Sequence, residues 1–486
     1  MSDESSGHQH LPGSTQHPMN VLVFMVDEMA WWALGHVSPD VHTPNIDRLA
    51  QRSIRFTQAY TPSPICVPAR AAIATGRYLH EIGYWSSAEA YDGRMPSWAH
   101  AVRNAGIDCV SFGKLHYRNA QDDTGFSQQI HPLHIPDGIG WVRGLLRKPL
   151  CDYAATAELA EQIGAGHTSY HEFDRSVANA ASQWLKDPKR KAAQWCAFVS
   201  FLSPHYPLVA PEQDFARYDP HRYEADAQDR PDHPILQEMW EFWDHDRFFT
   251  AESRGVAHAA YRGLCSFVDR QVGNVLDTLE ETGLAEDTLI LFTSDHGDMM
   301  GQHGFWVKSV MYDASARVPL LIAGPGIAPG DWHEPVSLID LAPTICAALN
   351  APAPDFPGHD LRHPEPGRAI LSEYHDGGAS VGITMLRWDH WKLIYYAEGH
   401  PPQLFDLQGD PDECADLSAT RPDILETAMR KLRQMMDPET VNERAHADQA
   451  RMIEQLGGRE ALLAMEQWNF TPAGGRKRTP DAIRAE

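Results

Sequence analysis

Cys66 stands at the entrance of a short predicted helix that contains Pro68 and Arg70 and ends at Gly76. Unpaired N–H groups and the positive end of the dipole at a helix N-terminus favour an anion. Arg70, one turn into the helix, adds a fork of donors that suits sulfate or phosphate oxygens. A lone cysteine before a helix is more often a buried structural residue. Together with the arginine, however, the pattern indicates an oxyanion site with a cysteine at its mouth.

Carboxylate and imidazole groups follow two apolar runs of the sequence. Asp27 and Glu28 come directly after residues 21–26, and Asp295 and His296 follow residues 288–292. A continuous apolar run of this length is typical of a strand buried on both faces of a parallel sheet. Hard ligands of this kind suit Ca²⁺, Mg²⁺ or Mn²⁺ better than a thiolate-bound zinc. One such Asp alone would be explained as a helix cap, but two sites predict a metal centre.

Cationic and proton-bearing residues follow two further apolar runs. Lys114 and His116 come after residues 107–112, and His205 comes after residues 195–202. Polar residues thus follow the same end of four predicted strands, and the carboxyl ends of parallel strands meet at one edge of a sheet. The alternation of strands with helical segments predicts an α/β fold: a large, mainly parallel sheet flanked by helices. We expect one common site at its carboxyl edge.

The pattern changes near Ser372 to short strands at residues 382–386, 392–396 and 403–407, followed by a helix at 423–436. We therefore expect a flexible N-terminal arm (1–19), a catalytic α/β domain (20–371), a smaller C-terminal antiparallel α+β domain (372–437) and a tail (438–486). An apolar set in the tail has no obvious place in either domain and consists of Met452, Ile453, Leu456, Leu462, Leu463 and Met465. This set predicts a homo-oligomer, a dimer or a tetramer.

The composition and charge of the chain limit the classes of partner that it can bind. The chain has 486 residues, of which 43% are hydrophobic, and a formal net charge of −25. Such a charge argues against nucleic acid or an anionic membrane as a partner, and any anionic substrate then needs a local cluster of cations. The seven cysteines are spread singly, without a metal-binding or disulfide-scaffold spacing. The N-terminus is polar and its first apolar run is too short for a signal segment, so we expect a cytoplasmic protein.

Residues 66–70, Cys-Val-Pro-Ala-Arg, resemble the C-x-[PA]-x-R sequence of type I sulfatases, a branch of the alkaline phosphatase superfamily. In that family the cysteine is oxidised to Cα-formylglycine, which implies a formylglycine-generating enzyme as a maturation partner. Ala69 departs from the serine of most members. The resemblance extends from about Asn20 to Asp416 and implies an alkaline phosphatase-like fold.

The resemblance also implies roles for the polar residues. One divalent ion, with Ca²⁺ expected first, Mn²⁺ second and Mg²⁺ third, would be held by Asp27, Glu28, Cys66, Asp295 and His296. Glu28 and His296 depart from the aspartate and asparagine of many members. Three cations would neutralise the sulfate oxygens: Arg70, Lys114 and Lys308.

Two histidines would divide the proton transfers. The hydrated aldehyde offers two hydroxyls, of which one attacks sulfur while His205 protonates the leaving alcohol. His116 would take the proton of the second hydroxyl, so that sulfate leaves by elimination and the aldehyde forms again. Either His116 or Lys308 alone would more often be a surface charge.

The ester class follows from Lys114 and His116. Phosphonate and phosphodiester hydrolases of this superfamily usually carry uncharged hydroxyl residues at these positions, so the pair favours a small-molecule sulfate monoester. Phosphonate hydrolysis stays the alternative, and a binding module with an unmodified Cys66 is a third. Aromatic residues at 31–32 and 239–244 predict core packing or a pocket wall for an aryl group. With Glu241 and Asp244 they would suit a quaternary ammonium such as choline.

Overall fold

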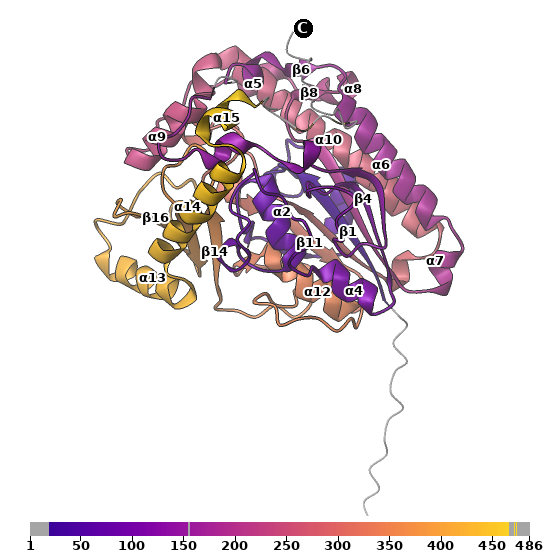
Figure 1. The fold of residues 1–486 in the computed structure, drawn as a ribbon. Helices are drawn as coiled ribbons and strands as arrows, with labels where there is room; N and C mark the ends of the chain where they lie inside the picture. Colours follow the sequence, from indigo (N-terminus) through magenta and orange to yellow (C-terminus); the bar gives the residue numbers. More distant parts are fainter. Residues whose placement is uncertain (1–18, 154–155, 466–470, 472, 474–486) are drawn as a thin grey trace, which may run out of the picture.

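The structure is a computed structural model that describes residues 19–153, 156–465, 471 and 473. The predicted N-terminal arm, apart from residue 19, and most of the tail after residue 465 lie outside the described residues. The confirmed fold is α/β, with a large mixed sheet at the centre and a small antiparallel sheet near the C-terminus (Figure 1).

Eight strands form the large sheet. Their spatial order is β12 (Gly330–Trp332), β2 (Ile54–Phe56), β11 (Leu320–Ala323), β9 (Thr288–Ser294), β1 (Asn20–Asp27), β7 (Trp195–Pro204), β4 (Asp108–Lys114) and β5 (Gln128–Leu133). The five strands from β9 to β5 run parallel, whereas β11 is antiparallel to both of its neighbours. Sequence patterning therefore predicted the central strands correctly.

Strand register brings the polar strand ends to one edge. In β1, Asp27 pairs with Pro204 and Val26 with Ser294. Gly113 of β4 pairs with Ser200 of β7. The residues that follow these strands therefore emerge together at the carboxyl edge, as parallel pairing requires.

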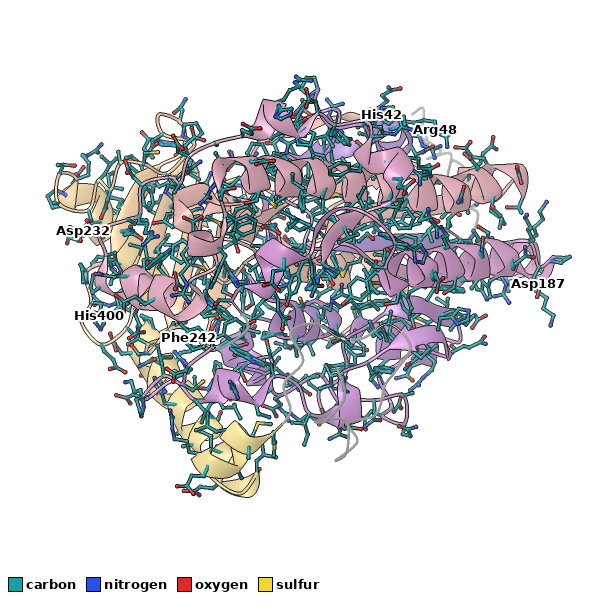
Figure 2. All side chains as sticks on the ribbon, turned by 90° about the horizontal axis from the view of Figure 1, so that it is seen from above. His42, Arg48, Asp187, Asp232, Phe242 and His400 are labelled. Carbon is teal, nitrogen blue, oxygen red and sulfur yellow. The ribbon has the colours of Figure 1, made fainter. Side chains whose placement is uncertain are left out.

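The two faces of the sheet belong to two separate cores. Val21, Val23 and Met25 of β1 point into one core, and Leu22, Phe24 and Val26 point into the other. The second core is covered by α10 (Ala251–Glu281), α6 (Ser169–Leu185) and α1 (Pro44–Ala50). Figure 2 shows α10 and α6 side by side, with Asp187 just beyond the end of α6. This alternation follows from the two-residue period of a strand.

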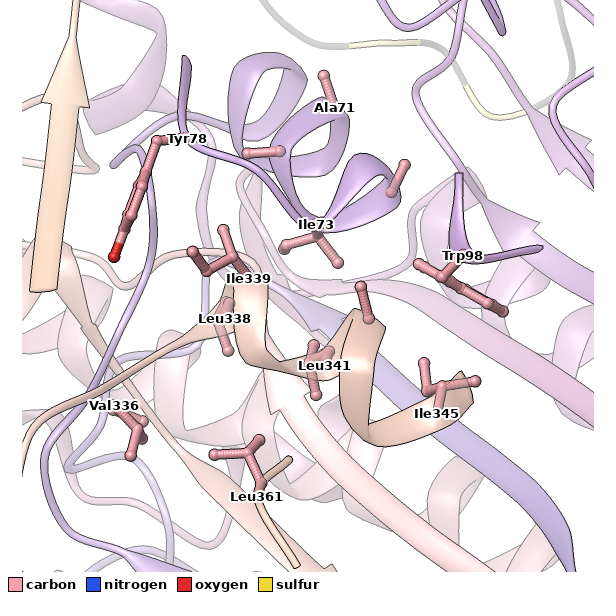
Figure 3. Close-up of a cluster of buried hydrophobic side chains, with 14 of the residues drawn as sticks. Ala71, Ile73, Tyr78, Trp98, Val336, Leu338, Ile339, Leu341, Ile345 and Leu361 are labelled. Atoms are coloured by element: carbon pink, nitrogen blue, oxygen red, sulfur yellow. The ribbon is translucent and has the colours of Figure 1, made fainter. Parts of the chain in front are cut away.

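Three helices cover the opposite face: α2 (Cys66–Thr75), α4 (Trp98–Asn104) and α12 (Leu341–Ala348). Figure 3 shows Ile73 on the side of α2 that faces Leu341 of α12. All ten residues of α2 are buried, and its last turn ends at Gly76 with φ 63°. This packing fixes the helix that carries Cys66.

Shorter elements complete the catalytic part of the chain. The helices are α3 (Leu79–Ile82), α5 (Glu158–Glu161), α7 (Lys189–Ala192), α8 (Glu212–Phe215), α9 (Pro234–Trp243) and α11 (Asp313–Ala316). The strands are β3 (Ala59–Tyr60), β10 (Arg317–Val318) and β13 (Val336–Ser337) in one small sheet, and β6 (Ile163–Ala165) with β8 (Leu208–Ala210) in another. Residues 54–60 thus contain two strands that belong to different sheets, β2 in the large sheet and β3 in a small one.

The C-terminal sheet is antiparallel, as predicted. It consists of β14 (Ala369–Tyr374), β15 (Ile383–Trp388), β16 (Trp391–Tyr396) and β17 (Gln403–Asp406), followed by α13 (Pro422–Met435). Lys392 of β16 is fully buried, and its Nζ lies 2.7 Å from a Glu413 carboxylate oxygen. Ile383 and Met385 share a core with Tyr60 and Met311, so the small sheet packs on the large domain. The domain boundaries remain predictions.

Two tail helices, α14 (Pro438–Gln455) and α15 (Arg459–Ala464), lie across the molecule (Figure 1). Five of the six apolar tail residues pack with Val142, Leu145 and Leu146, namely Met452, Ile453, Leu456, Leu462 and Met465. Leu463 is 38% exposed. Because the chain itself covers most of this apolar face, the face is not an argument for oligomerisation. The oligomer and the cytoplasmic location stay predictions. No helix in the described part of the chain is long and apolar enough to cross a membrane.

Candidate active site

Four ligand groups meet at the carboxyl edge of the large sheet. One atom each from Asp27, Cys66, Asp295 and His296 lies within 4.8 Å of the others, and all four residues are buried. Asp27 ends β1, Asp295 follows β9, and Cys66 opens α2. The arrangement therefore joins three segments that are far apart in the sequence.

The protonation pattern of His296 suits metal binding. Its Nδ1 lies 3.0 Å from the Gly297 carbonyl oxygen, which can only accept a hydrogen bond, so the proton is on Nδ1. The lone pair on Nε2 then faces Cys66 Sγ at 3.0 Å and carboxylate oxygens of Asp27 and Asp295, each at 3.8 Å. Two carboxylates and a neutral imidazole form a donor set that fits a divalent ion. Residue 66 lies beside the same donors.

The side chain of Cys66, as encoded, is not a nucleophile. Burial, and next the Asp27 carboxylate, raise the pKa of the Cys66 thiol to about 12. Because the thiolate is the reactive form of cysteine, this residue is a protonated, inert thiol at neutral pH. An enzyme that uses position 66 for attack therefore needs a different group there.

Arg70 and Lys114 hold the ligand carboxylates from the protein side. Arg70 Nε lies 2.7 Å from Asp295 Oδ2, and its NH1 donates to the Lys114 carbonyl and to Ser200 Oγ. Lys114 Nζ forms an ion pair with Asp27. Burial would raise the pKa of Asp27, but Lys114 and Arg70 outweigh burial and hold that pKa well below its usual range. Asp27 is thus an anion ready to bind a cation. Within the described part of the chain, Arg70 Nη2 has no hydrogen-bond partner.

Glu28 turns away from the four-ligand group. It has φ 67°, and its Oε2 lies 3.0 Å from Lys308 Nζ and 3.2 Å from His205 Nε2. Burial raises the pKa of the Glu28 carboxyl, and Lys308 opposes that shift. Its Oε1 is buried without a hydrogen-bond partner. In this structure Glu28 therefore supports Lys308 and His205, and its predicted role as a metal ligand stays a prediction.

His205 and Lys308 form a proton-sharing pair. His205 Nδ1 lies 2.8 Å from the Tyr206 carbonyl oxygen and donates to it, so Nε2 accepts from Lys308 Nζ at 2.8 Å. Burial and Lys308 lower the pKa of His205 well below its ordinary value. Burial alone would lower the pKa of Lys308, but the carboxyl groups around it, Glu28 and Asp27, oppose burial, and the net shift of that pKa is upward. The shared proton therefore resides on Lys308.

His116 belongs to the same group of residues as Lys114, His205 and Lys308. Its Nε2 is 2.6 Å from Thr471 Oγ1, and its Nδ1 is buried with no hydrogen-bond partner among the described residues. Burial and Lys114 lower the pKa of His116 well below its ordinary value, so the ring is neutral. A neutral imidazole can accept a proton, as the predicted base must.

A cavity of about 160 Å³ opens above Cys66, Lys114, His116, His205 and Lys308. Its wall carries a group of aromatic and imidazole rings: Trp141, Tyr153, Tyr170, Tyr206, Trp243 and His245. Glu158 adds a carboxylate to the wall. The structure therefore places a ring-lined pocket with one acidic residue next to the oxyanion site.

Sequence reasoning found only part of this wall. Of the residues predicted as an aromatic border, Trp243 lines the cavity, whereas Trp31 lies under the Arg317 guanidinium and Trp32 packs near Tyr261. Glu241 and Asp244, which the structure describes, do not line this cavity either. Tyr206 could have been found, because it follows His205 and stacks on it. Trp141, Tyr153 and Thr471 carry no such signal.

The fold and the site define a hydrolase of the alkaline phosphatase superfamily, and three comparisons with known proteins specify it. The family model described as sulfatase matches residues 19–351. The model described as N-sulphoglucosamine sulphohydrolase, C-terminal, matches residues 301–440. The chain is similar to a choline-sulfatase of Rhizobium meliloti, at 34% identity over 82% of each chain.

It is also similar to arylsulfatase K of Bos taurus, at 29% identity over 84% of this chain and 79% of that protein. Among solved structures, a phosphonate monoester hydrolase of Agrobacterium radiobacter superimposes with a TM-score of 0.69 at 26% identity, covering 88% of this chain and 96% of that one. This chain belongs to the sulfatase family. It is a sulfuric ester hydrolase.

Proposed function

We propose that this enzyme hydrolyses a small sulfate monoester with a formylglycine made from Cys66 by a formylglycine-generating enzyme. The observation that carries the proposal is the meeting of residue 66 with Asp27, Asp295 and His296, surrounded by the buried cations Arg70 and Lys114. The protonated thiol of the encoded cysteine supports a modified residue rather than thiolate chemistry.

A divalent ion would be held by Asp27, residue 66, Asp295 and His296, with Ca²⁺ first, Mn²⁺ second and Mg²⁺ third. When bound, such an ion supplies the positive charge that lowers the pKa of a nearby hydroxyl and makes it a nucleophile at neutral pH. Arg70, Lys114 and Lys308 would bind the sulfate oxygens and stabilise their charge in the transition state. This local cluster overcomes the chain's net charge of −25.

The proton for the leaving alcohol would come from the Lys308–His205 pair. Lys308 Nζ carries the proton and donates it to His205 Nε2 in a hydrogen bond of 2.8 Å, and both residues line the cavity. An arriving sulfate monoanion favours a second proton on the pair, because it adds negative charge next to both groups. His205 would then be the group that hands a proton to the ester oxygen.

Replacing His205 by alanine tests this assignment. We expect kcat for an alkyl sulfate to fall by about 10²-fold or more, the usual contribution of general acid catalysis. For nitrophenyl sulfate the loss should stay below about tenfold, because nitrophenolate leaves without a proton. His171→Ala is the matched control, because His171 is also buried but bonds the Val209 carbonyl outside the cavity. An equal loss for both esters would contradict the acid role.

We propose that the pocket binds the sulfate ester of an organic cation. Tyr153, Trp243 and Trp141 stack or meet edge to face, with ring centres 5.0 to 6.0 Å apart, and Glu158 lies in the same wall. Aromatic faces and a carboxylate are the groups that bind quaternary ammonium ions. The similarity to a choline-sulfatase supports this substrate class.

A panel of choline, alkyl and nitrophenyl sulfates with a phenyl phosphonate ester checks the substrate class. We expect choline sulfate to be the best substrate. Trp243→Ala should raise KM for choline sulfate by about 3- to 30-fold, as expected for a cation–π contact, and alter KM for the neutral alkyl sulfate less. Trp240→Ala on the same helix, outside the cavity wall, is the control. A preference for the phosphonate would favour the alternative reaction.

A further inference from the structure

The C-terminal segment contributes a residue to the active site. Thr471 lines the cavity, and its Oγ1 lies 2.6 Å from His116 Nε2 although the two residues are 355 positions apart in the sequence. The other described residue of this segment, Ala473, packs against Leu133, Tyr170 and Leu202. Neither residue belongs to a segment that the sequence pattern linked to catalysis.

Thr471 is held in place by its own backbone. The Tyr170 hydroxyl donates to the Thr471 carbonyl oxygen at 2.9 Å. Tyr170 is the second residue of α6, and it is buried. Thr471 is therefore held at two points, by Tyr170 at its backbone carbonyl and by His116 at its hydroxyl.

We propose that Thr471 is a positioning residue that sets the tautomer of His116. This inference rests on the proposed role of His116 as the base. In it, the Thr471 hydroxyl oxygen accepts the Nε2–H of the imidazole, so that the proton of the neutral ring is on Nε2. The free lone pair is then on Nδ1, the nitrogen that is buried and has no hydrogen-bond partner in the described part of the chain. A histidine tautomer is generally set by the hydrogen bond at its other nitrogen.

The proton and electron balance of the step is complete. Nδ1 takes the proton of the free hydroxyl on residue 66 as that O–H bond breaks. The released electron pair forms the C=O bond of the aldehyde, and the bond from carbon to the sulfate oxygen breaks, so that sulfate leaves with its electron pair. Nε2 keeps its own proton throughout the step, and this proton stays hydrogen-bonded to the Thr471 hydroxyl oxygen. Without this contact the neutral ring can carry its proton on Nδ1. Nδ1 then has no lone pair with which to accept the proton of the hydroxyl.

Three full-length variants test the proposal. We expect Thr471→Val to lower kcat by about 10- to 100-fold, the range for losing a hydrogen bond to a ring that becomes charged. KM should change by less than about twofold, and a sulfate adduct on residue 66 should build up. Thr471→Ser, which keeps the hydroxyl, should retain activity within about threefold. Thr427→Val is the matched control, because that hydroxyl bonds only the Asp423 carbonyl of its own helix.

A double-mutant cycle with His116→Ala separates positioning from folding effects. His116→Ala should give a burst of alcohol, slow turnover and the same adduct, and the double variant should be no slower than His116→Ala alone. If the loss of kcat in the double variant equalled the product of the two single losses, Thr471 would not act through His116. That result would overturn the proposal.

Imidazole ¹⁵N NMR reads the tautomer without reference to activity. The His116 signals, assigned by their loss in His116→Ala, should show the proton on Nε2 in the unmutated protein and a shift toward Nδ1 in Thr471→Val. Unchanged signals would overturn the inference. If His116→Ala instead kept full turnover, the base role in the proposed function would be wrong, while the NMR result would still decide whether Thr471 sets the tautomer.

Discussion

Cys66→Ala should lower kcat by about four to six orders of magnitude, the loss found when a covalent nucleophile is removed. The proposed reaction passes through residue 66 twice, once in attack on sulfur and once in the release of sulfate. Alanine offers no oxygen for either step. Initial-rate assays on nitrophenyl sulfate, with mass spectrometry of the peptide that contains residue 66, give both the activity and the chemical state of the residue.

The unmutated peptide should be about 18 Da lighter than its sequence mass, because sulfur and hydrogen are exchanged for an aldehyde oxygen. Cys66→Ser should be nearly inactive after a single turnover, since one hydroxyl can attack but no second hydroxyl remains to expel sulfate. Cys346→Ala, a buried cysteine in α12 outside the cavity wall, should keep normal turnover. A full-mass Cys66 peptide in a fully active enzyme would contradict the formylglycine proposal.

Asp295→Asn should lower kcat by about 10³-fold or more, because a metal site contributes several kcal/mol of charge stabilisation. Asp295 Oδ1 also accepts the N–H groups of Glu28 and His296, and its Oδ2 pairs with Arg70. The amide keeps the shape but loses the charge of one ligand. Elemental analysis should therefore show less than one bound divalent ion per chain, a readout that does not depend on activity.

Removing a buried carboxylate also costs stability, because Arg70 loses its partner. Asp269→Asn is a suitable control: Asp269 is 1% exposed and caps α1 through Asn45 and Ile46. It should lower the melting temperature but leave kcat and metal content unchanged. Near-normal turnover by metal-free Asp295→Asn would remove the ion from the mechanism.

Much of the fold could be predicted because the signals are local. The run before Asp27 is buried along its whole length in β1, and the run before Asp295 is β9. Apolar runs that end in charged residues encode both a buried strand and its polar end. Parallel pairing then requires that Asp27, Lys114 and Asp295 come together. Cys66 needed no such argument, because proline and arginine at fixed spacing mark its helix.

Local patterns could not show which strand-end residues touch one another. Glu28 has the charge of a metal ligand, but its φ of 67° turns its side chain toward Lys308 and His205. The apolar set of the tail resembles an interface in sequence, yet α14 and α15 use it to pack against residues 142–146. An apolar face does not encode which surface will cover it.

The sequence by itself determined the family, the central strands of the sheet and the chemical types at its carboxyl edge, because these follow from short-range periodicity and motif spacing. Only the tertiary structure decided the pocket wall, where Trp141, Tyr153 and Trp243 come from separate segments, and the contact of Thr471 with His116. Such contacts join residues hundreds of positions apart. They depend on how whole helices and strands pack against one another, and local sequence patterns do not encode that packing.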